Sequence, residues 1–307
     1  MRLQLRSLVA AVALLSAASP FAGAVDLLFV TLSNNTIVKF DTTGNVGAAI
    51  QATQATFATN LSGPQGLAFD SSGNLYATIT GTESISKFNS SGGYLSNINL
   101  NFQSNPSGLA FDSSGNLYAA NSGESTITKF NSSDAYDSNI SSNLNGPQGL
   151  AFDISGNLYA ANSGNNSIRK FNSSGGYVSN ISSNLNNPSG LAFDSSGNLY
   201  AANFLASTIS KFDSSGGYVS TITGNLNNPT GLAFDSSGNL YAANSSNNTI
   251  SKFDSSGNFL TSWSTGVAPA FIAFQPVSGP EPSTYALAAI ATGVMAAVAR
   301  RRKARMA

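Results

Sequence analysis

Cysteine and histidine are both absent from the 307-residue chain. Without cysteine the chain can form no disulfide and offers no thiolate for nucleophilic chemistry. Without histidine it lacks the commonest general base and the commonest metal ligand of proteins. Charged residues are also scarce, at 9% of the sequence. These absences exclude Cys- and His-dependent enzyme mechanisms and leave carboxylate, amide and hydroxyl groups as the main polar chemistry of the chain.

The charge that is present is unevenly distributed. Seven of the fourteen basic residues lie near the two ends, and the body between Val25 and Gly279 holds seven basic and thirteen acidic residues. Nucleic-acid binding needs a basic surface that neutralises phosphates. Because the body is mildly acidic, nucleic acid is not expected as a partner.

Two short markers recur along the body at intervals of about 41 residues. Repeats of this length are typical of one supersecondary unit that is used many times. The pentapeptide Gly-Leu-Ala-Phe-Asp begins at Gly66, Gly108, Gly149, Gly190 and Gly231. The dipeptide Lys-Phe begins at Lys39, Lys87, Lys129, Lys170, Lys211 and Lys252.

One repeat contains four predicted strands separated by turns. In the repeat that starts at Pro188, the short apolar or alternating segments are 190–193, 199–202, 208–212 and 218–222. Asp-Ser-Ser-Gly turns separate the first strand from the second and the third from the fourth, since Asp caps such turns and Gly supplies positive φ. Each repeat is therefore expected to fold as one four-stranded antiparallel sheet.

The two ends of the repeat array complement each other. The N-terminal unit lacks a first strand but has the later ones, while a degenerate first strand stands alone at 269–274. Pairing of this last strand with the N-terminal unit would close a ring of six sheets. The predicted fold class is all-β, a six-bladed β-propeller closed by pairing of its N- and C-terminal strands, with a short apolar helix added at the C-terminus. An open solenoid is the alternative.

The repeat resembles the NHL repeat, most clearly at 149–171 and 231–253, and the resemblance extends over nearly all of 25–275. It implies a propeller with a ligand site around the channel mouth. One feature departs from the NHL pattern, which usually has Asp after the second strand. Here that position is Asn121, Asn162, Asn203 or Asn244.

The first 24 residues are expected to be a secretory signal peptide. Arg2 and Arg6 precede a short apolar run, and Ala22-Gly23-Ala24 has the small residues of a cleavage site. A buried N-terminal helix is the alternative. The predicted domain organisation is a signal peptide at 1–24, the propeller at 25–276 and a C-terminal sorting segment at 277–307.

The sorting segment has three parts in a fixed order. Pro280, Glu281 and Pro282 precede an apolar stretch at 285–299, and a basic cluster of Arg300, Arg301, Arg302 and Lys303 follows it. The apolar stretch is shorter than the ~20 residues of a typical transmembrane helix, and the basic cluster would hold its end in the cytoplasm. The order resembles the PEP-CTERM sorting signal of Gram-negative bacteria. A permanent tail anchor is the alternative.

The PEP-CTERM resemblance implies a route and a set of partners. The chain would be exported, held for a time in the inner membrane, and processed by an exosortase, which is a membrane cysteine protease. Its final place would be the cell envelope, the cell surface or the extracellular matrix. Exopolysaccharide of a biofilm and envelope proteins are the partners that the resemblance suggests.

Candidate ligand-binding residues lie in the loops that follow the second strands. The four asparagines Asn121, Asn162, Asn203 and Asn244 are expected on this face, together with the apolar pair Phe204 and Leu205. Glu83 and Glu124 lie in equivalent loops of adjacent repeats and are candidate ligands for Ca²⁺, which prefers oxygen donors; as solvated loop charges they would hold no metal. Tyr94, Tyr136, Tyr177 and Tyr218 open the fourth strands, where they would cover the rim or stack on sugars.

The sequence favours a binding or structural module over an enzyme. The repeated Asp residues occur at turns, which indicates a structural role, and no catalytic residue or cofactor is predicted. The alternative is a metal-dependent, lactonase-like hydrolase with its site in the propeller channel. The resemblance to NHL-type propellers implies this class, because six-bladed relatives include such hydrolases. A filler without a specific ligand is a third possibility.

Overall fold

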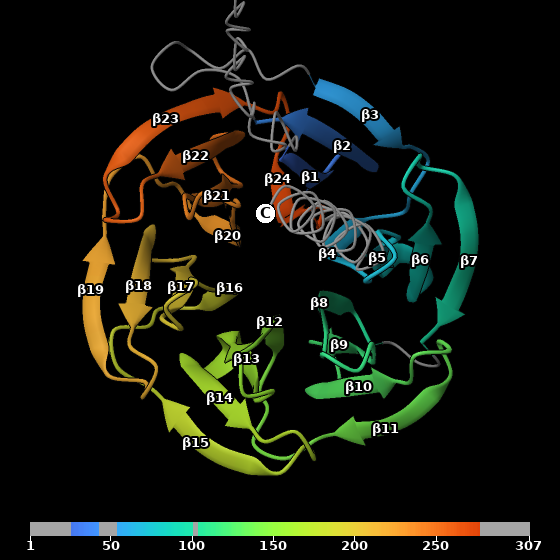
Figure 1. The fold of residues 1–307 in the computed structure, drawn as a ribbon, viewed down its shortest axis with the longest axis horizontal. Coiled ribbons are helices and arrows are strands. Elements are labelled where there is room, and N and C mark those ends of the chain that lie inside the picture. Colours follow the sequence, from blue (N-terminus) through green and yellow to red (C-terminus); the bar gives the residue numbers. More distant parts are fainter. Residues whose placement is uncertain (1–25, 43–53, 101–103, 277–307) are drawn as a thin grey trace, which may run out of the picture.

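A computed structural model of the protein describes residues 26–42, 54–100 and 104–276. These residues form six four-stranded antiparallel sheets, which are arranged as blades around a central axis (Figure 1). The all-β six-bladed propeller expected from the repeats is therefore confirmed. The predicted signal peptide, the sorting motif and the C-terminal apolar helix lie outside the described residues.

Each blade places its strands in sequence order from the axis outward, except that the first blade borrows its inner strand from the C-terminal end. Blade 1 has β24 (Pro269–Phe274), β1 (Leu27–Leu32), β2 (Thr36–Asp41) and β3 (Gln54–Ala58). Blade 2 has β4 (Pro64–Phe69), β5 (Leu75–Ile79), β6 (Ser84–Phe88) and β7 (Tyr94–Asn99); blade 3 has β8 (Pro106–Phe111), β9 (Leu117–Asn121), β10 (Thr126–Phe130) and β11 (Tyr136–Ile140).

The remaining blades follow the same plan. Blade 4 has β12 (Pro147–Phe152), β13 (Leu158–Asn162), β14 (Ser167–Phe171) and β15 (Tyr177–Ile181); blade 5 has β16 (Pro188–Phe193), β17 (Leu199–Asn203), β18 (Thr208–Phe212) and β19 (Tyr218–Ile222). Blade 6 has β20 (Pro229–Phe234), β21 (Leu240–Asn244), β22 (Thr249–Phe253) and β23 (Phe259–Ser264). Two 3₁₀ turns, η1 (Thr80–Thr82) and η2 (Ser163–Asn165), connect second and third strands.

The ring closes through β24 and β1, which pair antiparallel. Leu28 faces Phe274, Phe29 faces Ala273 and Val30 faces Ile272 in this pairing. The predicted completion of the N-terminal blade by the last strand is confirmed, and the open solenoid is excluded. This pairing covers the inner edge of β1 and gives blade 1 the same four strands as the other blades; a propeller of this kind leaves only short, protected sheet edges.

The hydrophobic core lies between neighbouring blades. In one cluster Tyr118 and Ile127 of blade 3 pack with Leu158 and Phe171 of blade 4. An aromatic pair crosses every blade boundary in an edge-to-face arrangement, which is a favoured geometry for rings. The pairs are Phe29–Phe69, Tyr76–Phe111, Tyr118–Phe152, Tyr159–Phe193, Tyr200–Phe234 and Tyr241–Phe274, with ring centroids 4.9–5.1 Å apart.

Candidate functional site

Three of the four predicted ligand-binding asparagines are buried parts of the blade framework. The Asn203 Nδ2 atom donates to the hydroxyl oxygens of Thr208 at 3.1 Å and Ser210 at 2.8 Å, on the adjacent strand. Its Oδ1 atom accepts a hydrogen bond from the backbone N–H of Asn186 at 3.2 Å. The side chain thus joins two strands to the loop that enters the same blade.

Asn244 and Asn162 make equivalent contacts. Asn244 donates to Ser251 at 2.9 Å and accepts from the backbone N–H of Asn227 at 3.2 Å. The Oδ1 atom of Asn162 accepts from the backbone N–H of Asn145 at 3.3 Å. The sequence interpretation placed these amides on an exposed loop face, whereas the structure buries them and uses their hydrogen bonds within the fold.

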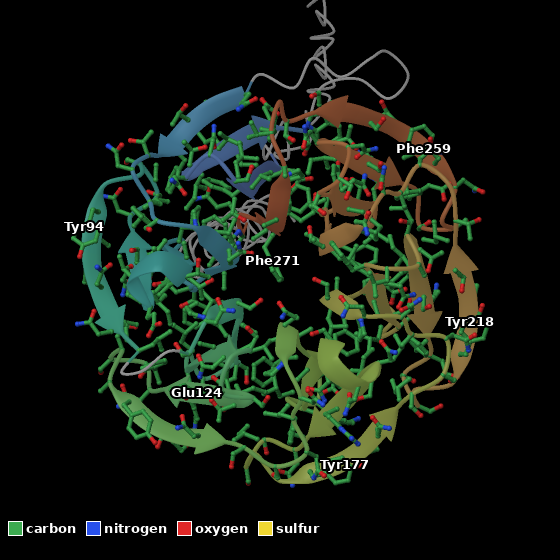
Figure 2. The ribbon with its side chains drawn as sticks, turned by 180° about the vertical axis from the view of Figure 1, so that it is seen from behind. Tyr94, Glu124, Tyr177, Tyr218, Phe259 and Phe271 are labelled. Carbon is green, nitrogen blue, oxygen red and sulfur yellow. The ribbon has the colours of Figure 1, made fainter. Side chains whose placement is uncertain are left out.

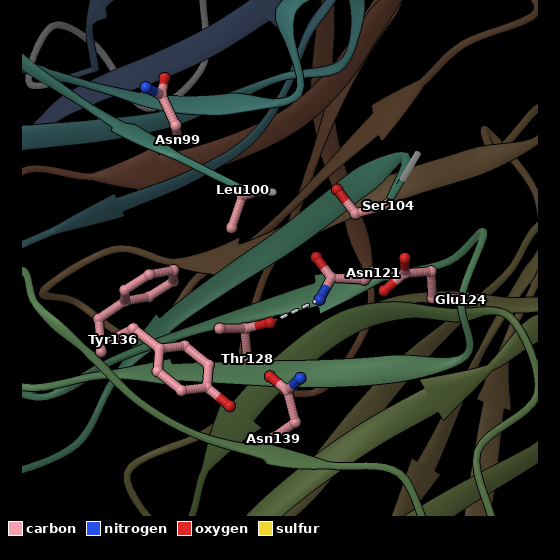
Figure 3. A pocket seen from close by; sticks show the side chains of 9 residues that line it. Asn99, Leu100, Ser104, Asn121, Glu124, Thr128, Tyr136 and Asn139 are labelled. Carbon is pink, nitrogen blue, oxygen red and sulfur yellow. Dashed lines mark hydrogen bonds between the residues drawn. The ribbon is translucent and has the colours of Figure 1, made fainter. Parts of the chain in front are cut away.

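Asn121 is buried as well, at 2% exposure, but its amide oxygen differs from the other three. Its Nδ2 atom donates to the Thr128 hydroxyl at 2.8 Å, as the dashed line in Figure 3 shows. Its Oδ1 atom has no hydrogen-bond partner among the described residues, and neither has the buried Ser104 hydroxyl. An unpaired buried acceptor is costly, so this pair of atoms marks a place where a ligand or water would be stabilised.

Both unpaired groups line a cavity of about 280 Å³ between blades 2 and 3 (Figure 3). Blade 2 contributes the end of β7 and the residue after it, and blade 3 contributes β9, β10, β11 and the loop after β9. The lining residues are Asn99, Leu100, Ser104, Asn121, Glu124, Thr128, Phe130, Tyr136 and Asn139. Of these, Asn121 and Glu124 belong to the predicted site.

The two candidate metal ligands do not share a site in the part of the chain that is described. Glu124 is exposed and lines the cavity, whereas Glu83 is not among the lining residues and ends η1 with a left-handed backbone at φ 47°. No three acidic side chains gather in a metal-binding arrangement within residues 26–42, 54–100 and 104–276. The polar side chains of the cavity supply one carboxylate, three amides and three hydroxyls.

The apolar pair predicted as an anchor is only partly exposed. Leu205 has 63% of its surface exposed, while Phe204 is half-buried. The carbonyl of Phe204 accepts a hydrogen bond from the Asn228 side chain at 2.9 Å, which ties this loop to the next blade. The exposed apolar surface here is therefore that of Leu205.

Aromatic residues mark the outer rim of the propeller. Tyr94, Tyr177, Tyr218 and Phe259 open the outer strands of four blades, and Figure 2 shows them at the circumference, with Phe271 near the axis. Tyr136 has the same position in blade 3 and is 63% exposed. Tyr136 lines the cavity. Tyr94, Tyr177 and Tyr218, which were expected to cover the rim or to stack on sugars, lie at the rim.

The repeated aspartates close the turns between first and second strands. The Oδ1 atom of Asp153 accepts hydrogen bonds from the backbone N–H groups of Ser155 and Asn157, and its Oδ2 atom accepts from the Asn157 side chain at 2.8 Å. The corresponding turns at Asp70, Asp112, Asp194 and Asp235 repeat all three bonds. These contacts confirm that the aspartates are turn residues.

A lysine and a tyrosine complete the turn in several blades. In blade 4, Lys170 Nζ lies 3.4 Å from Asp153 Oδ2 and 5.0 Å from the centre of the Tyr159 ring. Burial tends to raise the pKa of Asp153, but the Asn157 hydrogen bonds and Lys170 outweigh it and lower the pKa overall. Burial raises the pKa of Tyr159, and in blade 2 it raises the pKa of Tyr76 to about 12.

We expect the stability of the propeller to be flat between about pH 5 and 9 and to fall on both sides. The lowered pKa values of Asp153 and Asp194 give stability that is present above about pH 4 and is lost as the pH falls through the folded values. The raised tyrosine and lysine pKa values, as at Tyr159 and Lys170, give stability that is present below about pH 10 and is lost above it. Melting temperatures recorded by circular dichroism across this range test the profile. With no histidine in the chain, a step in melting temperature between pH 5.5 and 7.5 would contradict it.

Comparison with known families supports both parts of the sequence interpretation. The NHL repeat matches residues 226–253, which include β20, β21 and β22 of blade 6. The protein is thus a six-bladed β-propeller that contains an NHL repeat. More particularly, residues 280–303 match the PEP-CTERM protein-sorting motif, which includes the predicted Pro280, Glu281 and Pro282 and the arginine cluster. This motif implies export and processing by an exosortase at the cell envelope.

Solved structures of both binding proteins and enzymes share the fold. The nidogen/laminin complex matches with a TM-score of 0.73 at 19% identity, over 83% of this chain and 99% of that chain. A streptogramin B lyase matches with a TM-score of 0.63 at 16% identity, over 81% of this chain and 86% of that chain. Virginiamycin B lyase from Staphylococcus aureus matches with a TM-score of 0.59 at 16% identity, over 68% of this chain and 73% of that chain. Identities this low establish the fold alone. No curated protein matches the sequence.

Within the described ranges, none of the helices has the length and apolar character needed to cross a membrane. The apolar stretch at 285–299 lies outside those ranges. Its predicted insertion before processing therefore stays a prediction.

Proposed function

We propose that the protein is an exported, non-catalytic binding module that is sorted to the cell envelope by an exosortase. The observation that best supports this proposal is that the repeated aspartate carboxylates are already hydrogen-bonded within the fold. Asp153 and its four equivalents each accept three hydrogen bonds within their own turns, so they are held in structural contacts. The polar groups that remain open, at the cavity between blades 2 and 3, are suited to hydrogen bonding.

A rigid ring suits such a role for a physical reason. Six sheets with cores between them present loops whose positions are set by the framework, and binding then orders little additional chain. The envelope location follows from the sorting motif at 280–303. Exopolysaccharide and other envelope components are therefore the proposed partners.

The sorting step is tested by expression in a Gram-negative host with and without an exosortase. We expect the chain to lose its C-terminal segment only in the host that has the enzyme, and to move from the membrane fraction to the outer envelope or the medium. A variant with residues 280–303 deleted should show the same mass and location in both hosts. Mass spectrometry and fractionation provide the measurements.

Two results would contradict the proposal. Identical mass and location of the intact chain in both hosts would remove the exosortase step. Ca²⁺-dependent hydrolysis of lactones by the purified protein, with loss of that activity in Glu124→Gln, would replace the non-catalytic role by the lactonase-like alternative.

A further inference from the structure

The repeats provide an internal comparison for the cavity between blades 2 and 3. In blades 4, 5 and 6 the second strand ends in an asparagine whose side-chain oxygen accepts a hydrogen bond from the backbone N–H of the residue 17 positions earlier, namely Asn145, Asn186 or Asn227. In blade 3 the residue 17 positions before Asn121 is Ser104. Here the Asn121 oxygen and the Ser104 hydroxyl both lack a partner among the described residues. In blade 3 the oxygen of this asparagine therefore accepts no hydrogen bond from the described residues, whereas the equivalent oxygen in blades 4, 5 and 6 accepts one from the backbone.

The open groups are deeply placed. Asn121 and Ser104 are each 2% exposed, and both line the same cavity. The Asn121 amide is held in orientation by its bonds to Thr126 at 3.1 Å and Thr128 at 2.8 Å. A buried acceptor that is fixed in direction favours a ligand that brings its own O–H or N–H group.

The other lining groups narrow the class of ligand. Acceptors are supplied by the Glu124 carboxylate and the Asn121 oxygen, and the amides of Asn99 and Asn139 can both donate and accept. Hydroxyl groups match this mixture because each one both donates and accepts. An anion is disfavoured by Glu124, and an alkylammonium ion would offer no acceptor to the amide N–H groups.

The cavity also has apolar walls and a limited size. Leu100 and Phe130 supply apolar surface, and the Tyr136 ring stands at the exposed side. Apolar faces with polar edges are the surface pattern of a pyranose ring. The volume of about 280 Å³ is near the lower end of the ~300–1,000 Å³ typical of small-molecule sites, which suits one such ring.

We propose that the cavity between blades 2 and 3 binds a single neutral sugar unit of a polysaccharide. Asn121, Ser104 and Glu124 would accept or exchange hydrogen bonds with its hydroxyls, and Tyr136 would cover one face of the ring. This inference deepens the proposed binding function and rests on it.

The test uses the full chain and a panel of methyl glycosides of glucose, galactose, mannose and N-acetylglucosamine. Saturation-transfer NMR identifies the glycosides that bind, and titration gives their affinity. We expect at least one to bind, and Glu124→Gln to weaken it about tenfold, as expected for loss of one hydrogen bond to a charged group. Glu83→Gln makes the same charge change outside the cavity and should leave the affinity unchanged.

A second pair of variants tests the buried acceptor. Asn121→Ala and Asn203→Ala both remove two hydrogen bonds to hydroxyls on the third strand of a blade. Asn203→Ala also removes the acceptor of the Asn186 N–H, so its melting temperature should fall at least as far as that of Asn121→Ala. Only Asn121→Ala should abolish glycoside binding, measured well below the melting temperature of both variants. Equal affinities in the two variants would overturn the proposal.

Three further results would overturn the sugar site. They are binding of none of the four glycosides, equal affinities in Glu124→Gln and Glu83→Gln, or binding of butylammonium ion in place of any glycoside. A chain that is sorted by the exosortase but binds no sugar would lose this inference alone. A chain that is not sorted would lose the proposed function itself.

Discussion

Ile272→Asp is expected to unfold most of the protein under native conditions. Ile272 lies on the closing strand β24, is 5% exposed and belongs to a cluster with Leu28 and Val30 of β1. Loss of a buried aliphatic side chain costs about 2–5 kcal/mol, and burial of an unpaired carboxylate adds to that cost. The sum is comparable with the ~5–15 kcal/mol that separates folded from unfolded states.

The chain contains its own probe for this experiment. Its single tryptophan, Trp263, belongs to the same cluster as Ile272 and packs edge-to-face on Phe40 with ring centroids 6.0 Å apart. Urea unfolding followed by tryptophan fluorescence therefore reports on the closure, and far-ultraviolet circular dichroism reports on all six blades. If closure supports the whole ring, both signals should be lost together in Ile272→Asp.

A matched control is available at Ile154, which is 102% exposed at a turn of blade 4. The same substitution there, Ile154→Asp, should change stability by no more than about 0.5 kcal/mol. Equal urea midpoints for the two variants would show that β24 is not needed for the ring. A loss of fluorescence with unchanged circular dichroism would show that blade 1 opens without unfolding the others.

The architecture could be predicted from the sequence because the same strand and turn pattern occurs several times along the chain. The six Lys-Phe strands give the number of blades, and the unpaired strand at 269–274 gives the closure. Such patterns depend on backbone periodicity and burial, which a single sequence records well. The register between β24 and β1, with Val30 opposite Ile272 and a shift between Val30 and Leu32, was not predicted. Strands that are buried on both faces lack the apolar–polar alternation that specifies a register.

The site was harder to predict because a polar residue type does not indicate whether its side chain is exposed or buried. Asn203 was expected on the loop face, yet its amide is satisfied by hydroxyls five and seven residues further along, Thr208 and Ser210. Hydroxyls at these two spacings also follow Asn121 and Asn244, so the pattern was available as a signal for a buried strand contact. Ser104, Asn99 and Asn139 were missed because their convergence depends on how two blades pack.

One difference between repeats coincides with the cavity and was not used in the sequence interpretation. Three residues before the first-strand proline, blades 4, 5 and 6 have Leu144, Leu185 and Leu226, which pack on the hydrophobic clusters between blades. The corresponding residue before Pro106 is Gln103, which lies outside the described residues. The spacing of the glycine pentapeptide is also one residue longer at this boundary than at the later ones. In this chain the irregular repeat boundary, and not the regular polar positions, coincides with the cavity.

Gly149→Ala is expected to destabilise the protein by about 3 kcal/mol, the upper part of the usual range for overpacking. Gly149 is in β12, beside the axis, and a Cβ atom there would collide with the carbonyl oxygen of Ser189 and lie 3.0 Å from the Cα atom of Gly190. The obstructing atoms are backbone atoms of the next blade, so no side chain can move aside. Gly66, Gly108 and Gly190 meet the next blade in the same way, which explains why the pentapeptide begins with glycine.

The sign of the stability change in Gly149→Ala distinguishes a steric clash between blades from the intrinsic preference of alanine over glycine in a strand. In a strand without such contact, replacing glycine by alanine stabilises by roughly 0.5–1 kcal/mol. Gly156→Ala serves as the matched control, because Gly156 has a positive φ of 78° and nothing within 4 Å of an added Cβ. It should cost only the left-handed strain of about 1–2 kcal/mol. Urea unfolding of both variants measures the difference, and a neutral or stabilising Gly149→Ala would mean that the inner strands do not approach backbone to backbone around the axis.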